Sequence, residues 1–433
     1  MQFYSTNSPD VKVSLKEAVL RGLAADKGLY MPEAIPQLDA SFFEDIENKS
    51  LQEIGFEVLK PFFCPDIPED QFKTLVDDAL SFDIPAVKVT DDIFSLELFH
   101  GPTLAFKDVG ARFMARILSY FVQGQDKEIN ILVATSGDTG SAVANGFYKV
   151  AGINVFVLYP KGLVSEVQEK QFTTLGENIT SIEVDGTFDD CQRMVKEAFM
   201  DQELNDKLVL TSANSINLAR LLPQSIYYHH GYAQLRKQGV KDDIVYCVPS
   251  GNFGNITAGL VAQVMGLPVK KFIAATNIND IVPKYLETGE YIPAPSKATI
   301  ANAMDVGDPS NFVRMMDLYD SNHEVVTKKV EGISYTDDQI REGVKRVDES
   351  KGYVLDPHGA TGFMALENKL KDGEKGIFLE TAHPTKFPEV VEPVIGRKLD
   401  VPERLQAFMK GEPKNIQLKA TLEELKTFLL KEA

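Results

Sequence analysis

The sequence has few cysteines, and their placement excludes two kinds of stabilised fold. Cys64, Cys191 and Cys247 are odd in number, lie far apart and form no CxxC pair. Neither a disulfide framework nor a structural zinc site is therefore indicated, and we expect three reduced structural thiols. The histidines indicate no metal site either, because His229 and His230 are adjacent and adjacent helical residues do not share a face.

Long apolar runs and a signal peptide are also absent. The longest apolar stretches, such as INVFVLY at residues 153–159, are far too short to cross a bilayer. The N-terminal segment lacks the charged-then-apolar layout of a signal peptide. We therefore expect a cytoplasmic protein without a membrane partner.

Basic residues are outnumbered by acidic ones. The 45 Lys and Arg against 63 Asp and Glu give a net charge of −18. A surface of that sign repels nucleic acid and anionic membranes, so nonspecific binding to either is disfavoured. A local basic pocket for a small anion remains compatible with this balance.

What the sequence does contain is a regular alternation of strand-like and helix-like segments. The 433 residues suggest about three domain-sized units of ordinary globular composition. From about residue 129, short β-branched runs alternate with amphipathic stretches, which is typical of a parallel α/β sheet. The strand-like runs are INILVAT (129–135), NVFVLYP (154–160), ENITSIEV (177–184), KLVLTSA (207–213) and DIVYCVP (243–249).

The two ends of the chain have a different pattern. Residues 1–90 contain helix-like segments separated by joints rich in proline, which indicates a separate, mostly helical N-terminal domain. At the other end, TLEELKTFLLKEA is an amphipathic helix for which Thr421 is the expected N-cap.

Three loops follow strand-like segments, where ligands bind in α/β sheets. The first is SGNFGN, residues 250–255. Its two glycines let backbone N–H groups point at an anion, and the next helix adds the partial positive charge of its N-terminus, so a phosphate fits here. A tight turn without a ligand is the alternative for a bare GxxG. The loop is neither a Walker loop nor a GxGxxG fingerprint.

The other two loops are TSGDTGSA, residues 135–142, and ETAHPTKF, residues 380–387. The former offers hydroxyl and N–H groups to an anion such as a carboxylate, although Thr139 and Ser141 suit helix capping equally well. In the latter, Thr381 stands at a strand end with its hydroxyl available. A single threonine in such a place is usually structural.

Lys107 is the exceptional residue of an otherwise apolar approach to a helix, FHGPTLAFKDVGARFMARIL at residues 99–118. Burial disfavours the ammonium form and lowers the pKa of a lysine, which suits a nucleophile toward an aldehyde and later a general base. In the alternative, its stem packs on apolar surface while its amine reaches water or pairs with Asp108.

In their order along the chain, these motifs resemble those of the threonine synthases, a family of pyridoxal-phosphate (PLP) enzymes of fold type II. The resemblance spans nearly the whole chain. Its motifs are YSTNS, GLAADKGLYMPE, FHGPTLAFKD, ATSGDTGSA, SANSINLARLLPQ, PSGNFGN, AMDVGDPSNF, DPHGATG and ETAHPTKF.

The resemblance implies an α/β fold of PLP fold type II, with two parallel-sheet subdomains and a mostly helical N-terminal domain. It places the N-terminal domain at residues 1–90, the PLP catalytic core at 91–400 and a helical C-terminal segment at 401–433. Within the core, a smaller subdomain at about 131–212 is inserted in the larger one. The cofactor is expected between them, and the smaller subdomain is expected to close over the substrate.

The resemblance also implies cofactor contacts. Lys107 is expected to form the internal aldimine with PLP and then to move protons. Thr381 is expected to hydrogen-bond the pyridine nitrogen, where a neutral hydroxyl leaves that nitrogen largely unprotonated. Asp138 is expected beside the phenolic oxygen, where many fold type II enzymes have Asn. The residues expected to bind the cofactor phosphate are Gly251, Asn252, Phe253, Gly254 and Asn255.

The substrate implied by the resemblance is O-phospho-L-homoserine, which carries an anion at each end. Arg220 offers its phosphate a planar bidentate donor; without the resemblance this residue is interpreted as a surface arginine on a helix. The residues expected at the substrate carboxylate are Ser136, Gly137, Thr139 and Gly140, and those at its phosphate are Asn214, Ser215, Asn217 and Arg220.

The implied activity is that of a carbon–oxygen lyase, which makes L-threonine and phosphate from O-phospho-L-homoserine and water by γ-elimination and β-hydration. This is the last step of threonine biosynthesis. A related phospholyase releasing 2-oxobutyrate and ammonia is the alternative, and retention of the whole series of motifs favours the synthase. The SANSINLAR motif argues against a dehydratase, and PLP colour would exclude a non-catalytic binding protein. We expect a monomer or a homodimer.

Overall fold

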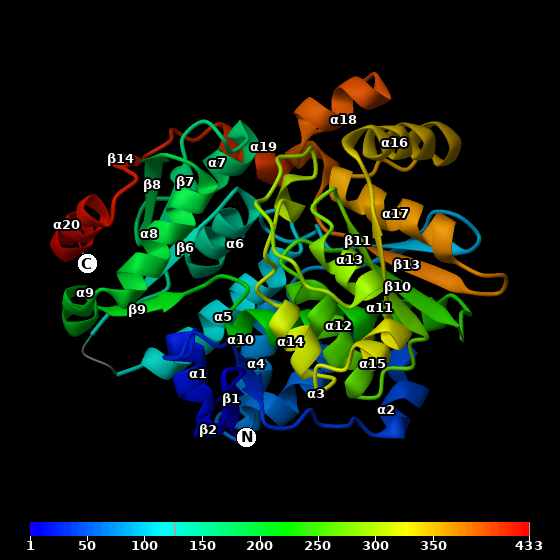
Figure 1. The fold of residues 1–433 in the computed structure, drawn as a ribbon, viewed down its shortest axis with the longest axis horizontal. Coiled ribbons are helices and arrows are strands. Elements are labelled where there is room, and N and C mark those ends of the chain that lie inside the picture. Colours follow the sequence, from blue (N-terminus) through cyan, green and yellow to red (C-terminus); the bar gives the residue numbers. More distant parts are fainter. Residues whose placement is uncertain (125–126, 242, 433) are drawn as a thin grey trace. The chain divides into compact units, whose positions relative to one another are not determined.

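The protein is described by a computed structural model covering residues 1–124, 127–241 and 243–432, and it divides into two compact units (Figure 1). The larger unit comprises Met1, Met31–Phe106 and Leu221–Asp400. The smaller unit comprises Gln2–Tyr30, Lys107–Arg220 and Val401–Ala433. Chain segments far apart in sequence therefore share each unit, and the domain boundaries given above stay predictions.

A six-stranded sheet forms the centre of the larger unit. Its strand order is β12-β11-β10-β13-β5-β4, and every neighbouring pair is parallel except β4 and β5. The strands IVYCVP and KGIFLE are almost wholly buried, as expected for strands covered on both faces. The strands are β4 (Ala86–Lys88), β5 (Ile93–Glu97), β10 (Ile244–Pro249), β11 (Lys271–Thr276), β12 (Val330–Ser334) and β13 (Lys375–Glu380).

The helices of the larger unit pack around this sheet. Helix α17 packs on β10, β11 and β13, while α16 contacts α17 and α18, and α11 contacts α3 and α12. These helices are α2 (Ala40–Glu44), α3 (Leu51–Phe63), α4 (Glu69–Ala79), α11 (Ser225–Lys237), α12 (Gly254–Val264), α13 (Ile281–Thr288), α14 (Phe312–Asp317), α15 (His323–Lys329), α16 (Asp337–Lys351), α17 (Pro357–Lys369) and α18 (Pro388–Ile395). Short 3-10 turns are η1 (Ile46–Asn48), η2 (Leu222–Gln224), η3 (Asn302–Met304) and η4 (Pro384–Lys386).

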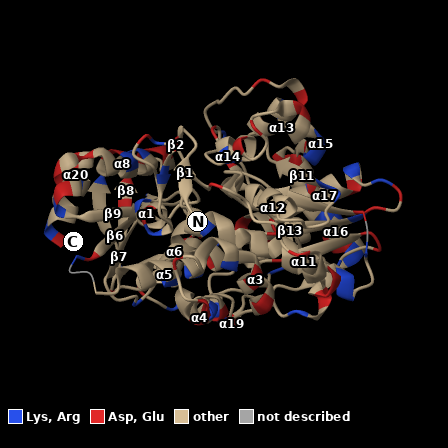
Figure 2. Cartoon of the chain, turned by 90° about the horizontal axis from the view of Figure 1, so that it is seen from below, with Lys and Arg blue, Asp and Glu red and all other residues tan. Residues whose placement is uncertain are grey.

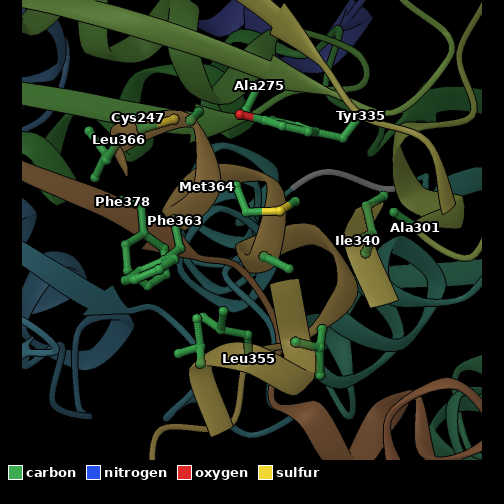
Figure 3. Close-up of a cluster of buried hydrophobic side chains, with 14 of the residues drawn as sticks. Cys247, Ala275, Ala301, Tyr335, Ile340, Leu355, Phe363, Met364, Leu366 and Phe378 are labelled. Atoms are coloured by element: carbon green, nitrogen blue, oxygen red, sulfur yellow. The ribbon is translucent and has the colours of Figure 1, made fainter. Parts of the chain in front are cut away.

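Burial of apolar side chains between α16, α17 and the sheet holds these layers together (Figure 3). Phe363 of α17 meets Phe378 of β13 edge to face, with ring centroids 5.9 Å apart. Each fully buried side chain of this kind stabilises the fold by roughly 1.5–3 kcal/mol. The sheet edge that carries the loops after β10 and β13 is therefore built on a firmly packed core.

A five-stranded sheet of order β14-β8-β7-β6-β9 forms the smaller unit, and all its neighbouring pairs are parallel. A β1–β2 hairpin belongs to the same unit. The strands are β1 (Phe3–Ser5), β2 (Ser8–Val13), β6 (Ile129–Ala134), β7 (Ile153–Pro160), β8 (Ile179–Asp185), β9 (Val209–Ser212) and β14 (Ile416–Lys419), while β3 (Tyr30–Pro32) spans the junction of the units. The helices are α1 (Leu15–Arg21), α5 (Lys107–Val122), α6 (Asp138–Phe147), α7 (Glu166–Thr173), α8 (Phe188–Met200), α9 (Gln202–Lys207), α10 (Leu218–Leu221), α19 (Glu403–Met409) and α20 (Leu422–Glu432).

The structure has a strand at each of the five strand-like runs, and Thr421 Oγ1 accepts from Glu424 N at the start of α20. Two local features differ from the sequence pattern. The amphipathic stretch that follows the strand-like run at 207–213, residues 216–239, is not one continuous helix, because Pro223 lacks an N–H and begins a new turn before α11. The C-terminal segment is not wholly helical, because β14 joins the sheet beside β8.

Charged residues of both signs are interspersed along the chain (Figure 2). Within the described ranges, none of the helices is long and apolar enough to cross a membrane. The same residues contain no group of three or more His, Cys, Asp or Glu placed to hold a metal ion.

Candidate active site

The loops after β10 and β13 lie at the same sheet edge. These strands are parallel neighbours, with Cys247 paired to Phe378, so their carboxyl ends meet. The first loop, residues 250–255, packs closely on the backbone of η3. A Cβ at Gly251 would lie 2.6 Å from Ala303 O and 2.8 Å from Met304 Cα, so only glycine fits there. Phe253 then takes a left-handed conformation, with φ 59°, directly before α12.

At the N-terminus of α12, a buried side-chain donor lacks an acceptor among the residues that the structure describes. No side chain of the described chain caps this helix at Phe253. Asn255 in its first turn is buried, and its Oδ1 accepts from Tyr228 Oη at 2.7 Å, whereas its Nδ2 has no hydrogen-bond partner in the described part of the protein. A free buried donor at a positive helix end suits a bound anion, so this donor set fits the phosphate of PLP.

Asn252 supports the loop from outside. Its Oδ1 accepts from Ser310 N at 2.6 Å, and its carbonyl oxygen accepts from Asn311 N and Nδ2 at 3.2 Å. Arg314 in α14 is fully buried and donates to Asn311 Oδ1 at 2.9 Å; burial lowers the pKa of this arginine to about 9. A buried arginine thus supports Asn311, which in turn bonds the loop at 250–255.

The second loop begins at Thr381, which is 7% exposed. Its carbonyl oxygen accepts from Phe106 N at 2.8 Å, and Ala382 forms an isolated bridge with Ala105. Lys386, fully buried, donates to Thr103 O at 2.9 Å. The backbone that leads into Lys107 is therefore fixed against the loop that carries Thr381.

In the smaller unit, Lys107 is half-buried at the first residue of α5. One turn further, Gly110 faces Arg220, and a Cβ at Gly110 would lie 3.1 Å from Arg220 Nε. Arg220 is only 4% exposed and its Nη1 donates to Ala213 O. The interpretation of Arg220 as a surface residue is therefore wrong, because it is buried against the helix of Lys107.

The loop before α10 contains the other residues predicted to bind a substrate phosphate. Asn217 uses both ends of its amide within the protein, because Nδ2 donates to Val19 O at 2.9 Å and Oδ1 accepts from Ala219 N at 3.0 Å. Asn214 Oδ1 is buried and has no partner among the residues described. If the Asn214 side-chain amide is rotated by about 180°, Nδ2 takes the place of Oδ1 and provides a donor suited to an anion. Ser215 is half-buried in the same loop.

The loop after β6 is shaped by two residues that sequence reasoning did not single out. Thr135 Oγ1 accepts from Gly137 N at 2.9 Å and from Gly140 N at 2.8 Å, so Thr135, not Thr139 or Ser141, caps α6. Gln168 packs closely on Gly137, where a Cβ would lie 2.5 Å from Gln168 Cδ.

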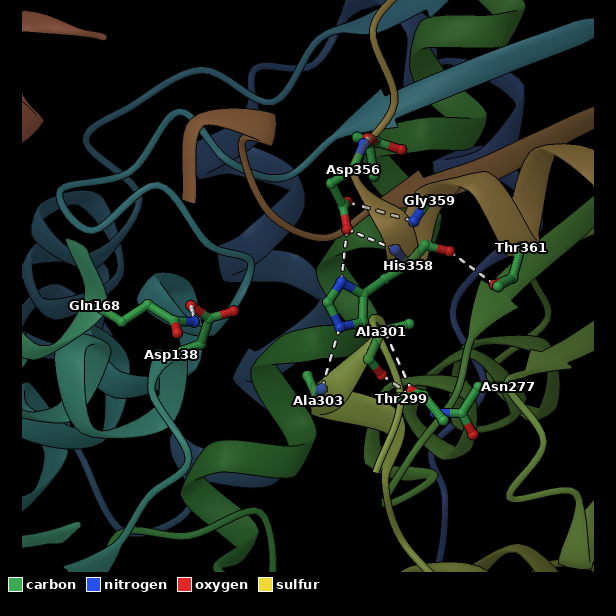
Figure 4. Close-up of polar contacts among 11 residues, drawn as sticks. Asp138, Gln168, Asn277, Thr299, Ala301, Ala303, Asp356, His358, Gly359 and Thr361 are labelled. Atoms are coloured by element: carbon green, nitrogen blue, oxygen red, sulfur yellow. Dashed lines mark hydrogen bonds and ion pairs between the residues drawn. The ribbon is translucent and has the colours of Figure 1, made fainter. Parts of the chain in front are cut away.

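The same glutamine fixes Asp138. Gln168 Nε2 donates to Asp138 Oδ1 at 2.8 Å, and Asp138 is 5% exposed (Figure 4). Thr135 stands at a strand end in the quoted motif, which is a usable signal. Gln168 lies on α7, thirty residues after Asp138, and no local pattern indicates it.

The larger unit holds the loop at 250–255, which follows β10, and Thr381, which follows the neighbouring strand β13. The smaller unit holds Lys107, the loop at 136–140 and the loop at 214–220.

Family models match most of the chain. The model described as pyridoxal-phosphate dependent enzyme matches residues 85–379. Those described as threonine synthase N terminus and threonine synthase, C-terminal match residues 2–80 and 359–429. Among curated relatives, threonine synthase of Haemophilus influenzae is 44% identical over 431 residues and covers all of both chains. That of Saccharomyces cerevisiae is 37% identical, covering 90% of this chain and 88% of its own.

Solved structures agree with these matches. The crystal structure of threonine synthase from Escherichia coli superposes with a TM-score of 0.94 at 41% identity over the whole of both chains. PLP-bound threonine synthase from Brucella melitensis gives 0.92 at 34% identity, covering 99% of this chain and 98% of its own. The predicted α/β fold of PLP fold type II is confirmed, and the chain belongs to the threonine synthase family of pyridoxal-phosphate-dependent enzymes.

Proposed function

We propose that the protein converts O-phospho-L-homoserine and water to L-threonine and inorganic phosphate. The observation that carries this substrate assignment is Arg220, a buried guanidinium packed against Gly110, one helical turn from Lys107. A guanidinium can offer a phosphate two parallel donors, so its position against the helix that begins at Lys107 supports a phosphorylated substrate. The matched threonine synthases support the same assignment.

The cofactor contacts follow from the larger unit. In our proposal, Gly251, Asn252, Phe253, Gly254 and Asn255 bind the PLP phosphate through backbone N–H groups and Asn255 Nδ2. Thr381 bonds the pyridine nitrogen with a neutral hydroxyl. Bound PLP supplies the electron sink that makes the substrate Cα–H acidic.

Side chains of the smaller unit hold and transform the substrate. Ser136, Gly137, Thr139 and Gly140 bind the carboxylate. The Gln168 contact fixes the Asp138 carboxylate, the proposed partner of the phenolic oxygen of PLP. Asn214, Ser215 and Arg220 bind the substrate phosphate, while Asn217 positions their loop through its bonds to Val19 and Ala219.

Lys107 moves the protons. Its neutral amine takes the Cα proton, a Cβ proton then leaves, and the Cγ–O bond breaks with release of phosphate. A proton returns to Cγ, hydroxide from water adds at Cβ, and Lys107 returns a proton to Cα, so that substrate and water balance threonine and phosphate. Arg220 stabilises the charge that develops on the departing phosphate. The departing phosphate is proposed to assist as base for the added water.

The test is product analysis of the purified holoenzyme with O-phospho-L-homoserine. Threonine and phosphate in equal amounts support the proposal. Formation of 2-oxobutyrate with ammonia would mean a phospholyase instead, and absence of released phosphate would remove the assignment of Arg220.

Location and assembly are part of the proposal as well. A reducing cytoplasm suits the three free cysteines, two of them buried. We propose a monomer or homodimer acting on this small molecule alone, which sedimentation of the holoenzyme tests.

A further inference from the structure

A buried polar cluster lies in the larger unit, beside the backbone that packs on the loop at 250–255. Figure 4 shows Asp356, His358 and Ala303 of this cluster. The cluster consists of Asp356, His358, Glu380 and the backbone of Ala303. All three side chains are at most 2% exposed. The proposed mechanism uses none of them, and DPHGATG was singled out in the sequence without a role.

Hydrogen bonding fixes the tautomer of His358. Ala303 N donates to His358 Nε2 at 3.2 Å, so Nε2 is an acceptor and carries no proton. The proton is therefore on Nδ1, which donates to Asp356 Oδ1 at 2.6 Å. Asp356 is itself immobile, because its carboxylate also accepts from His358 N at 2.7 Å and Gly359 N at 3.3 Å at the start of α17.

Ala303, which His358 holds, and Met304 pack on Gly251 of the proposed phosphate loop, and we call these two residues the wall. Ala303 lies in η3, and its carbonyl oxygen would be 2.6 Å from a Cβ at Gly251. On its far side the wall is anchored by Asp305, which accepts from Asn277 Nδ2 at 2.7 Å and Thr299 N at 3.0 Å. The turn η3 is thus held at two places: His358 bonds Ala303 within it, and Asp305 anchors the chain directly after it.

Glu380 extends the cluster to the other end of the proposed cofactor site. Its Oε1 accepts from Asp356 N at 2.7 Å, and it directly precedes Thr381. Burial and the neighbouring Asp356 raise its pKa well above the ordinary value. A Cβ at Gly359 would lie 1.6 Å from Glu380 Oε2, so glycine is required for this packing.

We propose that His358 is a positioning residue for the cofactor phosphate: its neutral Nε2, aimed by Asp356, holds the Ala303 N–H and thereby seats the wall against which Gly251 lies. The inference rests on the proposed role of residues 250–255. Because His358 bonds the wall directly, whereas the cluster reaches Thr381 only through Asp356 and Glu380, its substitution should affect the phosphate end of the cofactor more than the ring.

A comparison of PLP with pyridoxal binding separates this positioning role from a purely structural one. Apoenzyme is titrated with PLP and with pyridoxal, which lacks the phosphate, and binding is followed by visible absorbance. His358→Asn removes the acceptor at the Nε2 position, whereas His358→Gln keeps an oxygen near it. We expect His358→Asn to raise the Kd for PLP about tenfold and to leave the Kd for pyridoxal unchanged within about twofold. His358→Gln should stay close to the wild type for both.

Equal changes in both Kd values, or no change in His358→Asn, would overturn the inference. So would a loss in His358→Gln as large as in His358→Asn. If His358→Asn does not fold, the 31P resonance of bound PLP in His358→Gln decides, since the inference requires it to match the wild type.

Asn255→Ala and the wild type show which assignment has failed. A wild type that binds pyridoxal as tightly as PLP, with Asn255→Ala unchanged, removes the phosphate loop and the inference together. A wild type that prefers PLP, with Asn255→Ala weakened but His358→Asn unaltered, removes the inference alone.

Discussion

The two units carry the candidate site in different chemical forms. In the larger unit the groups that we propose to face a ligand are neutral: the backbone of residues 250–255, Asn255 and Thr381, with charged Arg314 buried behind them. In the smaller unit they include ionisable side chains, namely Lys107, Asp138 and Arg220. In our proposal, shape and backbone geometry therefore determine what the larger unit binds, whereas charge and proton transfer belong to the smaller unit.

This difference has a practical consequence. A backbone site is changed by altering what packs on it, as at Gly251, and a side-chain site is changed by truncating the side chain. We therefore expect substitutions in the larger unit to alter cofactor affinity and those of the proposed substrate-binding side chains in the smaller unit to alter turnover. Lys107, which is also proposed to carry the cofactor, should alter both.

The largest effect is expected for Lys107→Ala, which removes the proposed proton carrier. Turnover and the visible cofactor band should both be lost. Borohydride reduction of the wild type should attach PLP to the Lys107 peptide, as mass spectrometry would show. Lys386 is the matched control, because it is fully buried and its amine donates to Thr103 O. An adduct on Lys386, or a coloured and active Lys107→Ala variant, would exclude the assignment.

Arg220→Ala should lower kcat/KM for O-phospho-L-homoserine about 100-fold or more, because a buried charge-assisted donor pair to the phosphate is lost. The visible cofactor band should remain. Arg220→Lys keeps the charge but not the planar fork, so partial recovery is expected. Steady-state kinetics and an absorbance scan of the same samples provide the measurement. Loss of the cofactor band, with normal turnover per remaining holoenzyme, would mean that Arg220 contacts the cofactor and not the substrate phosphate.

Acid should weaken the larger unit first, because it contains the histidines whose pKa is lowered by burial, namely His229, His230 and His383. Burial lowers the pKa of His229 and His230 from 6.5 to about 4. Between these values the unfolded chain takes up protons that the folded state does not, so stability falls as the pH drops from 6.5 toward 4. A fully buried histidine contributes up to about 3 kcal/mol to this loss.

Hydrogen exchange, corrected for intrinsic rates, tests the acid effect by comparing peptides of the two units at about pH 7.5 and about pH 5. The larger unit should lose protection, and His229→Gln should reduce the loss. Earlier loss in the smaller unit would contradict the account. Asp305 has the opposite effect on stability. Burial raises its pKa to about 6, so the folded state takes up a proton before the unfolded chain does as the pH falls.

The smallest effects are expected from a matched pair of helix caps. Ser50 forms a capping box with Glu53 in the larger unit, and Thr187 forms one with Asp190 in the smaller unit. Each Ala substitution should lower the free energy of unfolding by about 1 kcal/mol without changing cofactor affinity or turnover. Thermal unfolding, a PLP titration and steady-state kinetics check these expectations. A turnover change in either variant would mean that stability and site are coupled.

Local patterns account for much of the architecture. The runs at 129–135 and 243–249 are apolar, short and followed by glycine-containing turns, so strand, loop and helix follow from neighbouring residues, as in β10, residues 250–255 and α12. Lys107 could be singled out because its surroundings are apolar.

Contacts between distant segments could not be predicted in the same way. Gln168 reaches Asp138 from another helix, and His358 reaches Ala303 across 55 residues, so neither contact leaves a periodic signal. The burial of Arg220 depends on the absence of a side chain at Gly110, over a hundred residues earlier. Strand β14 was missed because IQLK is short and follows a helix, and its pairing with β8 decides its conformation.

The division between the two units is tested most directly by measuring the Kd for PLP and kcat/KM for O-phospho-L-homoserine on Gly251→Ala and Arg220→Ala. The chain has no Trp, so visible absorbance serves as the binding signal. We predict that Gly251→Ala weakens PLP binding, because its methyl group meets Ala303 O, and that Arg220→Ala binds PLP like the wild type but loses turnover. Normal PLP affinity in Gly251→Ala together with weakened affinity in Arg220→Ala would contradict the account.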